Sequence, residues 1–144
     1  MMNIQSALIE ANKILAKNNI KSSKLDSEIL LSKVLKKDRK FIILNLDKIL
    51  NNIHYKKFKD LISQRSDRKP IAYLIGKKDF WKYEFYISDA ALIPRPETEI
   101  IIEQFLKFTS KNSTKHVLDV GTGSGCIIIS ILKERINCNG TALD

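Results

Sequence analysis

Apolar residues recur at helical spacing along the first 65 residues, which predicts a run of helices. The first helix is expected to start after Asn3, whose side chain can cap it. Its apolar face comprises Ile4, Ala7, Leu8, Ala11, Ile14 and Leu15. A second helix is expected to start at Ser23, because Ser23-Lys24-Leu25-Asp26 has the form of a capping box. Its predicted core face comprises Leu25, Ile29, Leu30 and Val34.

Two further apolar segments complete this part of the chain. The run from Phe41 to Leu46 is short, and the helix that follows it is expected to end near Arg65. The apolar positions of that helix are Ile53, Phe58, Leu61 and Ile62. Core packing explains all of these stripes, so residues 3–67 are predicted to form a small helical bundle.

The pattern changes at Lys69-Pro70, because proline disfavours continuation of a helix. Gly76 supplies a turn, and the residues after it are aromatic and β-prone. A β-hairpin is predicted around a tight connection, with Phe80 and Lys82 on one side of it and Phe85 and Ile87 on the other. Trp81 is interpreted as a hairpin anchor, and a ligand-stacking role is the alternative.

Two prolines, Pro94 and Pro96, flank Arg95 and are expected to hold it in an extended conformation. Pro96, Glu97 and Glu99 then open a helix, with the glutamates in its positive first turn. A well-capped helix accounts for the glutamates, but it gives no reason for an arginine fixed between two prolines.

The last part of the chain has the order strand, glycine loop, helix, strand and acid. His116 to Val120 predicts a strand, and it runs directly into Gly121-Thr122-Gly123-Ser124-Gly125. The segment from Cys126 to Arg135 predicts a helix, and a second strand is expected to end at Thr141-Ala142-Leu143-Asp144. This order opens a doubly wound, Rossmann-like nucleotide-binding sheet, so the fold class is predicted to be α/β.

The glycine loop and Asp144 together predict a nucleoside site. Glycines let the backbone turn sharply and approach a ligand closely, and we expect the loop amides and the helix start to face that ligand. Asp144 can accept hydrogen bonds from the ribose hydroxyls of an adenosine. It lies 19 residues beyond Gly125, close to the spacing of about 20 expected for that role.

The glycine spacing separates two classes of cofactor. A dinucleotide fingerprint has the form Gly-x-Gly-x-x-Gly, but Cys126 occupies the position of its third glycine. The glycines alternate instead, and Asp119 completes an Asp-x-Gly-x-Gly-x-Gly pattern. That pattern is similar to the first motif of the S-adenosylmethionine-dependent methyltransferases.

Composition and charge narrow the classes of function further. An apolar content of 44% excludes a disordered tail. The net charge of +9 raises the question of nucleic-acid binding. However, lysines greatly outnumber arginines and are spread along the chain, as an AT-rich genome would produce, and no known RNA-binding motif occurs. A basic surface for an acidic or ribosome-associated partner stays open as an alternative.

Neither a signal peptide nor a membrane span is predicted. The first residues carry too many polar side chains, and the apolar run from Cys126 to Leu132 is too short to cross a bilayer. A cytoplasmic protein is therefore expected. Cys126 and Cys138 match neither a disulfide framework nor a metal site. We interpret Cys126 as a packing residue, although a helix start can lower the pKa of a thiol.

Several segments occur in a characteristic order along the chain. They are Asp26-Ser27-Glu28-Ile29-Leu30-Leu31, Arg68-Lys69-Pro70-Ile71-Ala72-Tyr73-Leu74-Ile75-Gly76, Asp79-Phe80-Trp81, Leu92-Ile93-Pro94-Arg95-Pro96-Glu97-Thr98-Glu99, and Val117 to Gly125. Together they closely resemble the HemK/PrmC family, the protein-glutamine methyltransferases that modify peptide chain release factors. The resemblance covers essentially the whole chain and about the first half of a family member.

The resemblance implies an enzyme that uses S-adenosyl-L-methionine to methylate the side-chain amide of a release-factor glutamine. By that resemblance, the cofactor would be held by Gly121, Thr122, Gly123, Ser124, Gly125 and Asp144. Asp119 would steady the loop or reach the methionine end of the cofactor, and Arg95 with its flanking prolines would border the substrate pocket. Residues 1–67 would recognise the release factor, 68–96 would form a hairpin and linker, and 97–144 would begin the cofactor-binding domain. Neither a membrane nor direct nucleic-acid contact is implied, and the oligomeric state is left open.

The family's catalytic motif, Asn-Pro-Pro-Tyr, does not occur in these 144 residues, so no catalytic residue is assigned. In the family that motif orients the glutamine amide, whose nitrogen lone pair is delocalised into the carbonyl. We therefore expect the isolated chain to be inactive, to bind the cofactor weakly and to expose apolar sheet surface.

Three alternatives stay open from the sequence alone. One is a fragment of a dinucleotide-dependent oxidoreductase, and another is a non-enzymatic basic interaction protein that acts through its helical bundle. The third is a truncated product with no function of its own.

Overall fold

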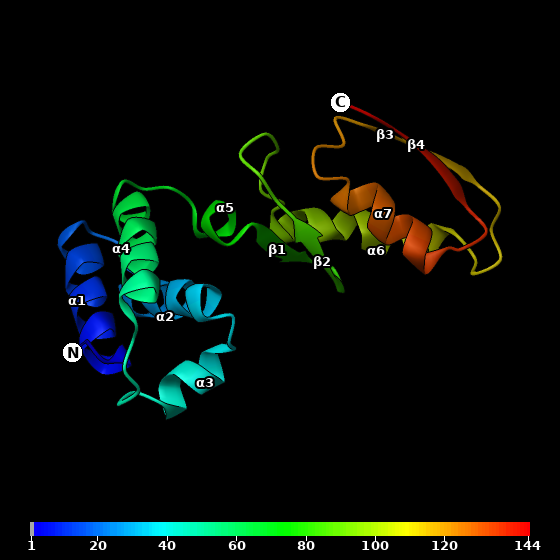
Figure 1. Cartoon of the computed structure of the whole chain (residues 1–144). Coiled ribbons are helices and arrows are strands. Elements are labelled where there is room, and N and C mark those ends of the chain that lie inside the picture. The colour runs from blue at the N-terminus through cyan, green and yellow to red at the C-terminus, as the bar shows by residue number, and fades with distance from the viewer. Residues whose placement is uncertain (1) are drawn as a thin grey trace. The chain divides into compact units, whose positions relative to one another are not determined.

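The computed structural model describes residues 2–144, and these residues form two compact units (Figure 1). One unit ends at Ile75, and the other runs from Gly76 to Asp144. The first is helical throughout, whereas the second combines two small sheets with two α-helices.

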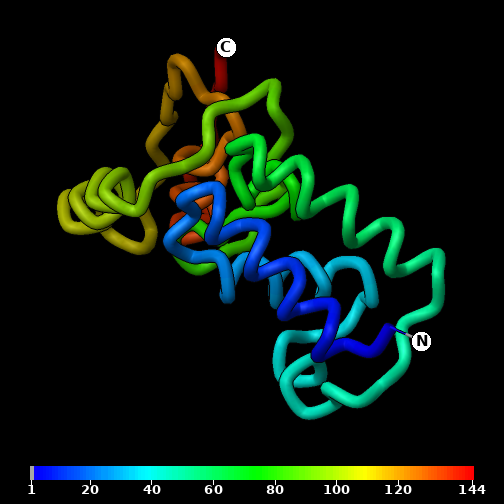
Figure 2. Tube along the Cα trace, turned by 90° about the vertical axis from the view of Figure 1, so that its left-hand side faces the viewer, coloured from blue at the N-terminus to red at the C-terminus, as the bar shows by residue number. Residues whose placement is uncertain are grey.

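The helical unit is built on three helices that pack against one another, α1 (Ile4–Lys17), α2 (Ser23–Leu35) and α4 (Asn52–Ser66) (Figure 2). Two shorter helices complete it, α3 (Arg39–Leu44) and α5 (Ile71–Ile75). The core is formed by Ile4, Ala7, Ala11, Leu15, Ile20, Leu30, Leu31, Ile42, Leu50, Phe58, Ile62 and Leu74. The predicted helical bundle is therefore confirmed.

Polar side chains fix the starts of three of these helices. Asn3, Asp38 and Asn51 precede α1, α3 and α4, and each accepts a hydrogen bond from the backbone amide three residues later. Each bond satisfies an amide that has no partner within its helix. The cap predicted at Asn3 is confirmed.

The capping box predicted at Ser23 is wrong, although α2 does start at that residue. Ser22 occupies the cap position and makes no side-chain cap bond. Asp26 turns into the core instead, where its carboxylate accepts a hydrogen bond from Arg65 Nε at 2.7 Å. The buried face of α2 also differs from the prediction, since Leu25 is exposed and Leu31 is buried.

Two ion pairs bind buried carboxylates of α2 within residues 2–75, and both use arginine. Arg65 pairs with Asp26, and Arg39 Nε lies 2.5 Å from Glu28 Oε2. Arg65 also donates to the carbonyl oxygen of Lys69. Because a buried carboxylate without a partner costs several kcal/mol, these arginines are essential to the bundle.

Helix α5 was not predicted, because Pro70 was expected only to end helical structure. The carbonyl oxygen of Pro70 accepts hydrogen bonds from the amides of Tyr73 and Leu74, so the proline starts a new helix. Proline suits a first helical turn, where its missing N–H is no loss. Lys33 Nζ donates to the carbonyl oxygen of Leu74 and ties α2 to this short helix.

The predicted β-hairpin opens the second unit. Strand β1 (Lys77–Phe80) pairs with β2 (Tyr83–Tyr86) in antiparallel register, with Phe80 opposite Tyr83. The connection is Trp81-Lys82, so Lys82 lies in the turn and not in the first strand as predicted. Trp81 has φ +57°, a conformation that is rare for residues other than glycine.

The Pro-Arg-Pro segment has the predicted form. Arg95 is extended, with φ −98° and ψ 140°. A 3₁₀ turn, η1 (Pro96–Thr98), then leads into α6 (Glu99–Phe108). At the far end of α6, the buried guanidinium of Arg135 donates to the carbonyl oxygens of Leu106 and Thr109. A cation suits that end because the terminal carbonyls carry partial negative charge.

The final part of the chain forms the predicted β-α-β unit. Strands β3 (His116–Val120) and β4 (Asn139–Leu143) are parallel and joined through α7 (Cys126–Glu134). Helix α7 approaches β4 closely, because a Cβ at Gly140 would lie 2.7 Å from Ile128 Cδ1. The structure confirms the α/β class, with a helical bundle, a hairpin and the first unit of a Rossmann-like fold.

Apolar side chains of the β3–β4 sheet are exposed in this structure. Leu118, Val120 and Leu143 have exposed fractions of 60%, 72% and 53%. Parallel sheets are normally covered on both faces, so this surface suits contact with other protein. The expected apolar sheet surface is confirmed.

The described residues contain neither a membrane-spanning helix nor a metal cluster. No helix within residues 2–144 combines the length and apolarity required to cross a bilayer. The same residues contain no group of His, Cys, Asp or Glu side chains suited to holding a metal ion.

Ser130 of α7 is fully buried, and its hydroxyl is without a hydrogen-bond partner in the described structure. We expect Ser130→Ala to raise the free energy of unfolding by about 1 kcal/mol, because it removes an unsatisfied polar group. Chemical denaturation measures the change. Ser32→Ala in α2 is the matched control, since Ser32 Oγ donates to the carbonyl oxygen of Glu28. If both substitutions stabilise the protein equally, the gain comes from helix propensity alone.

Candidate functional site

The candidate site begins where β3 ends in the glycine loop. Gly121, Gly123 and Gly125 have φ values of +79°, +51° and +73°, a region that L-residues rarely adopt. A Cβ on Gly121 or Gly123 would meet nothing within 4 Å, so space is open beside the backbone at both positions. The alternating glycines are therefore a requirement of the backbone path between β3 and α7.

Hydrogen bonds hold this loop to the end of β4. The amides of Gly121 and Thr122 both donate to the carbonyl oxygen of Leu143, at 2.8 and 3.0 Å. The amide of Gly125 donates to the carbonyl oxygen of Thr122. The expectation that the loop amides face a ligand is wrong for these three, because they already have partners within the protein.

Asp144 lies beside the loop, as its position after β4 predicts. The amide of Gly123 donates to Asp144 Oδ1 across 3.3 Å. The aspartate is exposed, and a carboxylate can accept about four hydrogen bonds, so it can bind further donors. The structure thus brings the glycine loop and the acid together from positions 21 residues apart.

Asp119, the last acid before the loop, has a supporting role. Its Oδ2 atom accepts a hydrogen bond from Thr122 Oγ1 at 2.9 Å. This bond ties the end of β3 to the second loop residue. Of the two roles that the family resemblance implied for Asp119, the contact supports steadying the loop.

The start of α7 completes this side of the site. Gly125 occupies its cap position and provides no side chain to satisfy the first amides of the helix. Cys126 follows and is buried, and burial raises the pKa of its thiol. The burial of Cys126 confirms its interpretation as a packing residue.

Arg95 lies on the surface of the same unit. Its side chain is exposed, whereas the preceding Pro94 is buried and fixes the segment to the unit. The guanidinium of Arg95 therefore faces solvent, and the backbone next to it is fixed to the unit at Pro94.

Trp81 is fixed at the hairpin turn by two glutamates whose contacts with it were not predicted. Its backbone amide donates to Glu99 Oε1 in α6, and its indole Nε1 donates to Glu134 Oε1 in α7, each at 2.8 Å. Lys82 Nζ lies 2.8 Å from the same Glu134 oxygen. These contacts hold the positive φ angle of Trp81 and confirm its role as a hairpin anchor. We call this arrangement the tryptophan clamp.

The tryptophan clamp is expected to open at acidic pH. Hydrogen bonds from Lys82 and Trp81 lower the pKa of Glu134 below its ordinary value. The stabilisation is therefore complete above the ordinary glutamate pKa of about 4.3, and it is lost as the pH falls through the lowered value. Trp81 is the only tryptophan, so its fluorescence emission reports the opening directly as a shift to longer wavelength.

Glu134→Gln tests this assignment, because the glutamine keeps a hydrogen-bond acceptor but does not titrate. The acid-induced shift of the emission should disappear in this variant. Glu103→Gln on the exposed face of α6 is the control and should retain it. An unchanged transition in Glu134→Gln would mean that another carboxylate controls the environment of Trp81.

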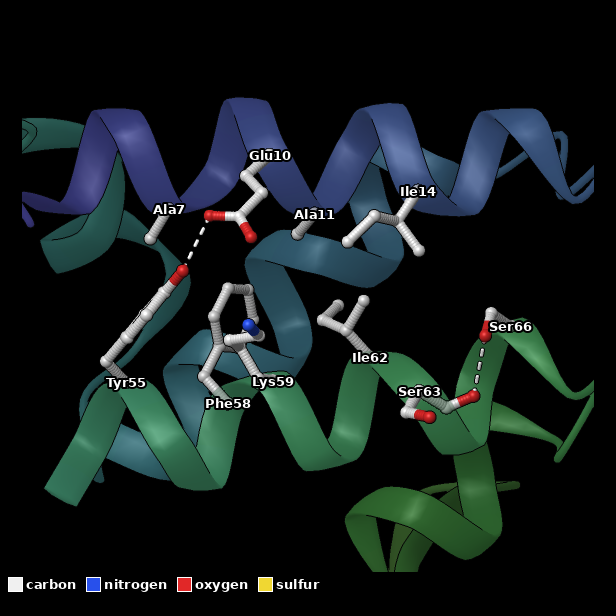
Figure 3. A pocket seen from close by; sticks show the side chains of 10 residues that line it. All are labelled: Ala7, Glu10, Ala11, Ile14, Tyr55, Phe58, Lys59, Ile62, Ser63 and Ser66. Atoms are coloured by element: carbon white, nitrogen blue, oxygen red, sulfur yellow. Dashed lines mark hydrogen bonds between the residues drawn. The ribbon is translucent and has the colours of Figure 1, made fainter. Parts of the chain in front are cut away.

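A separate groove lies in the helical unit between α1 and α4 (Figure 3). Its volume is about 180 Å³, and Ala7, Ala11, Phe58 and Ile62 contribute apolar lining. Tyr55 closes one side by donating its hydroxyl to Glu10 Oε2 at 2.6 Å, and this bond raises the pKa of the tyrosine. Most of the lining surface is apolar, so the groove supports binding more than chemistry.

Comparison with known proteins identifies the family. Residues 6–76 match the family model of the PrmC N-terminal domain. The chain is 42% identical over 132 residues to the release factor glutamine methyltransferase of Clostridium acetobutylicum, covering 92% of this chain and 46% of the relative. The chain belongs to the PrmC family.

Two further relatives extend the match over nearly all of this PrmC-family chain. The release factor glutamine methyltransferase of Buchnera aphidicola subsp. Schizaphis graminum is 43% identical over 143 residues, covering 99% of this chain and 51% of the relative. A bifunctional methyltransferase of Rickettsia felis is 33% identical, covering 98% of this chain and 32% of the relative. The chain spans about half the length of the release factor glutamine methyltransferases that it matches.

Proposed function

We propose that these residues belong to an S-adenosyl-L-methionine-dependent methyltransferase that modifies a glutamine side chain of a peptide chain release factor. The observation that carries the proposal is the contact between the glycine loop and Asp144. The methyltransferase names of the relatives support the reaction class, and their full names support the substrate.

The geometry favours an adenosyl cofactor held between the loop and Asp144. We propose that the exposed carboxylate of Asp144 accepts hydrogen bonds from the ribose hydroxyls. The open space beside Gly121 and Gly123 admits the ligand next to the backbone. Thr122 and Ser124 complete the contact surface, and the uncapped first turn of α7 offers amides to an anionic group such as the amino-acid carboxylate.

A dinucleotide is the less suitable ligand for this loop. A dinucleotide places its pyrophosphate on backbone amides at the helix start, and the third glycine allows close packing of helix and strand. Here Cys126 occupies that third position, and the amides of Gly121, Thr122 and Gly125 are bonded within the protein. An uncharged adenosine next to the loop requires fewer hydrogen bonds from those amides.

The remaining segments have proposed roles in handling the substrate. Residues 1–67 would recognise the release factor, and the exposed Arg95, in the linker over residues 68–96, would border the entry of the glutamine. Residues 97–144 would carry the cofactor. We place this activity in the cytoplasm, where peptide chain release factors act.

Cofactor preference tests the proposal in the chain itself. S-adenosylhomocysteine at about ten times its dissociation constant should stabilise the second unit by about 1.4 kcal/mol, which raises the melting temperature by about 6–11 °C. NAD at the same concentration should leave the melting temperature unchanged. Stabilisation by NAD and none by S-adenosylhomocysteine would support the oxidoreductase alternative and contradict the proposal.

Methyl transfer itself is proposed to require residues beyond these 144. The sequence contains no Asn-Pro-Pro-Tyr motif to orient the glutamine amide, so the cofactor site alone supplies no means of activating it. The 144-residue polypeptide should transfer no labelled methyl group from S-adenosylmethionine to a release factor. Incorporation above background would contradict this part of the proposal.

A further inference from the structure

The net positive charge of this chain lies entirely in the helical unit. Residues 1–75 hold 16 Lys and Arg against 7 Asp and Glu, whereas residues 76–144 hold nine of each. The first unit therefore carries the whole formal net charge of +9, and the second is neutral. A codon bias of the genome acts on both halves of a gene, so it does not explain this difference.

The lysines within residues 2–75 take part in no ion pair, and Lys33 Nζ donates to the carbonyl oxygen of Leu74. Both ion pairs within residues 2–75 use arginine, and no lysine there lies within 4.0 Å of a carboxylate oxygen. The two carboxylates in those pairs are buried, so they screen little of the surface charge.

Five of these lysines line two neighbouring grooves at one end of the bundle. Lys33, Lys36 and Lys57 line a groove of about 310 Å³ between α2 and α4, with Asp60 as its one acid. That acid accepts a hydrogen bond from Gln64. A second groove, of about 280 Å³, is lined by Lys37, Lys48 and His54 together with apolar side chains that include Phe41 and the exposed Ile49.

The lining residues of the two grooves are close together in sequence, both after α2 and on α4. Lys36 and Lys37 are consecutive at the end of α2, and His54 and Lys57 are one turn apart on α4. We call the surface formed by Lys33, Lys36, Lys37, Lys48 and Lys57 the basic face.

We propose that the basic face binds the phosphate backbone of a double-helical nucleic acid without reading its sequence. Ammonium groups that share a surface and form no ion pairs are complementary to an array of phosphates. The concave form suits a strand that runs along it, and none of the large exposed apolar side chains lines the first groove. A lipid surface or an amphipathic protein helix would instead require apolar side chains there.

The aromatic residue on this surface favours a duplex over a single strand. Single-strand binding depends on aromatic rings on which bases stack. The half-buried ring of Phe41 lies under the ammonium groups of Lys37 and Lys48, 5.6 and 5.0 Å from its centroid. Two cations beside this half-buried ring compete with a stacked base, so contact with the phosphate backbone is favoured.

Fluorescence anisotropy with the full 144-residue chain and a labelled RNA duplex tests the proposal. A plot of log affinity against log salt concentration should have a slope of about −4, because five lysines displace counterions from the phosphates. A DNA duplex of the same length should bind with similar affinity. Failure of both duplexes to bind at low salt would overturn the proposal.

Two variants with the same net charge show whether binding depends on the basic face or only on the total charge of the chain. Lys36→Gln/Lys37→Gln/Lys57→Gln should reduce the magnitude of the slope to about 2 and weaken binding at least tenfold. The control, Lys13→Gln/Lys17→Gln/Lys21→Gln, removes exposed lysines from α1 and the loop after it. That end lies near the C-terminal end of α4, since Arg68 donates to the carbonyl oxygen of Asn18.

The control variant should bind like the unmodified chain, and circular dichroism confirms that both variants remain folded. If both variants lose the same affinity for the duplex, binding depends on net charge alone, and the proposal for the basic face is overturned. Vesicles that contain anionic lipid provide the last arm. If they bind the chain tightly while the duplexes do not, the surface belongs to a membrane and the proposal fails.

Discussion

Arg65→Ala is expected to lower the free energy of unfolding of the helical unit by about 3–5 kcal/mol. The substitution leaves the Asp26 carboxylate buried between α2 and α4 without its partner, and it removes the bond to the carbonyl oxygen of Lys69. The pair is well shielded, since the side chains of Arg65 and Asp26 are 17% and 5% exposed. Urea denaturation followed by helical circular dichroism measures the change.

Two comparisons assign that loss to the buried carboxylate. Arg68→Ala removes an exposed arginine of the same helix end and should change stability by less than about 1 kcal/mol. Asp26→Leu combined with Arg65→Met removes both charges and should recover most of the loss. If the double variant is as unstable as Arg65→Ala, packing of the arginine stem matters more than its charge.

Gly123→Val is expected to weaken S-adenosylhomocysteine binding by about tenfold or more. Valine at φ +51° strains the backbone by about 1–2 kcal/mol, and relief of that strain moves the amide that contacts Asp144. The side chain also enters the open space beside the loop, where the ligand is proposed to lie. Isothermal titration calorimetry measures the affinity.

Gly76→Val provides the matched control for this loop variant. Gly76 has φ +76°, and a Cβ there also meets nothing within 4 Å, so the local strain is similar. It lies at the start of the hairpin, outside the loop. We expect a comparable loss of stability with unchanged affinity. If the two valine variants bind S-adenosylhomocysteine with equal affinity, the glycine loop is not part of the cofactor site.

Features that depend on neighbouring residues could be predicted from the sequence. The cap at Asn3, the end of α4 near Arg65 and the β-α-β order around the glycine loop are all set by local spacing. The position of Asp144 beside the loop also follows from local rules, because the ends of adjacent parallel strands meet at one edge of the sheet.

Features that depend on distant partners could not be predicted. Asp26 fits a capping box in sequence, yet Arg65, 39 residues away, draws it into the core. Glu99 looks like a helix-dipole residue, yet it binds the amide of Trp81. The second partner of Trp81, Glu134, lies 53 residues along the chain, and no pattern in the sequence connects them.

The glycine pattern predicted the shape of the loop but not where its hydrogen bonds go. Open conformational space at Gly121 follows from its residue type, whereas the bond from its amide to Leu143 depends on the register of β4. Helix α5 shows the same limit, because Pro70 is compatible both with the end of one helix and with the start of another.

The division between arginine and lysine in the helical unit makes its fold and its surface chemically separable. Guanidinium groups of Arg39 and Arg65 hold the buried acids, whereas the amines lie outside the ion pairs. Acetylation reacts with lysine amines and spares arginine, so it would neutralise the exterior while the internal pairs persist. A cell could therefore alter what this unit attracts without unfolding it.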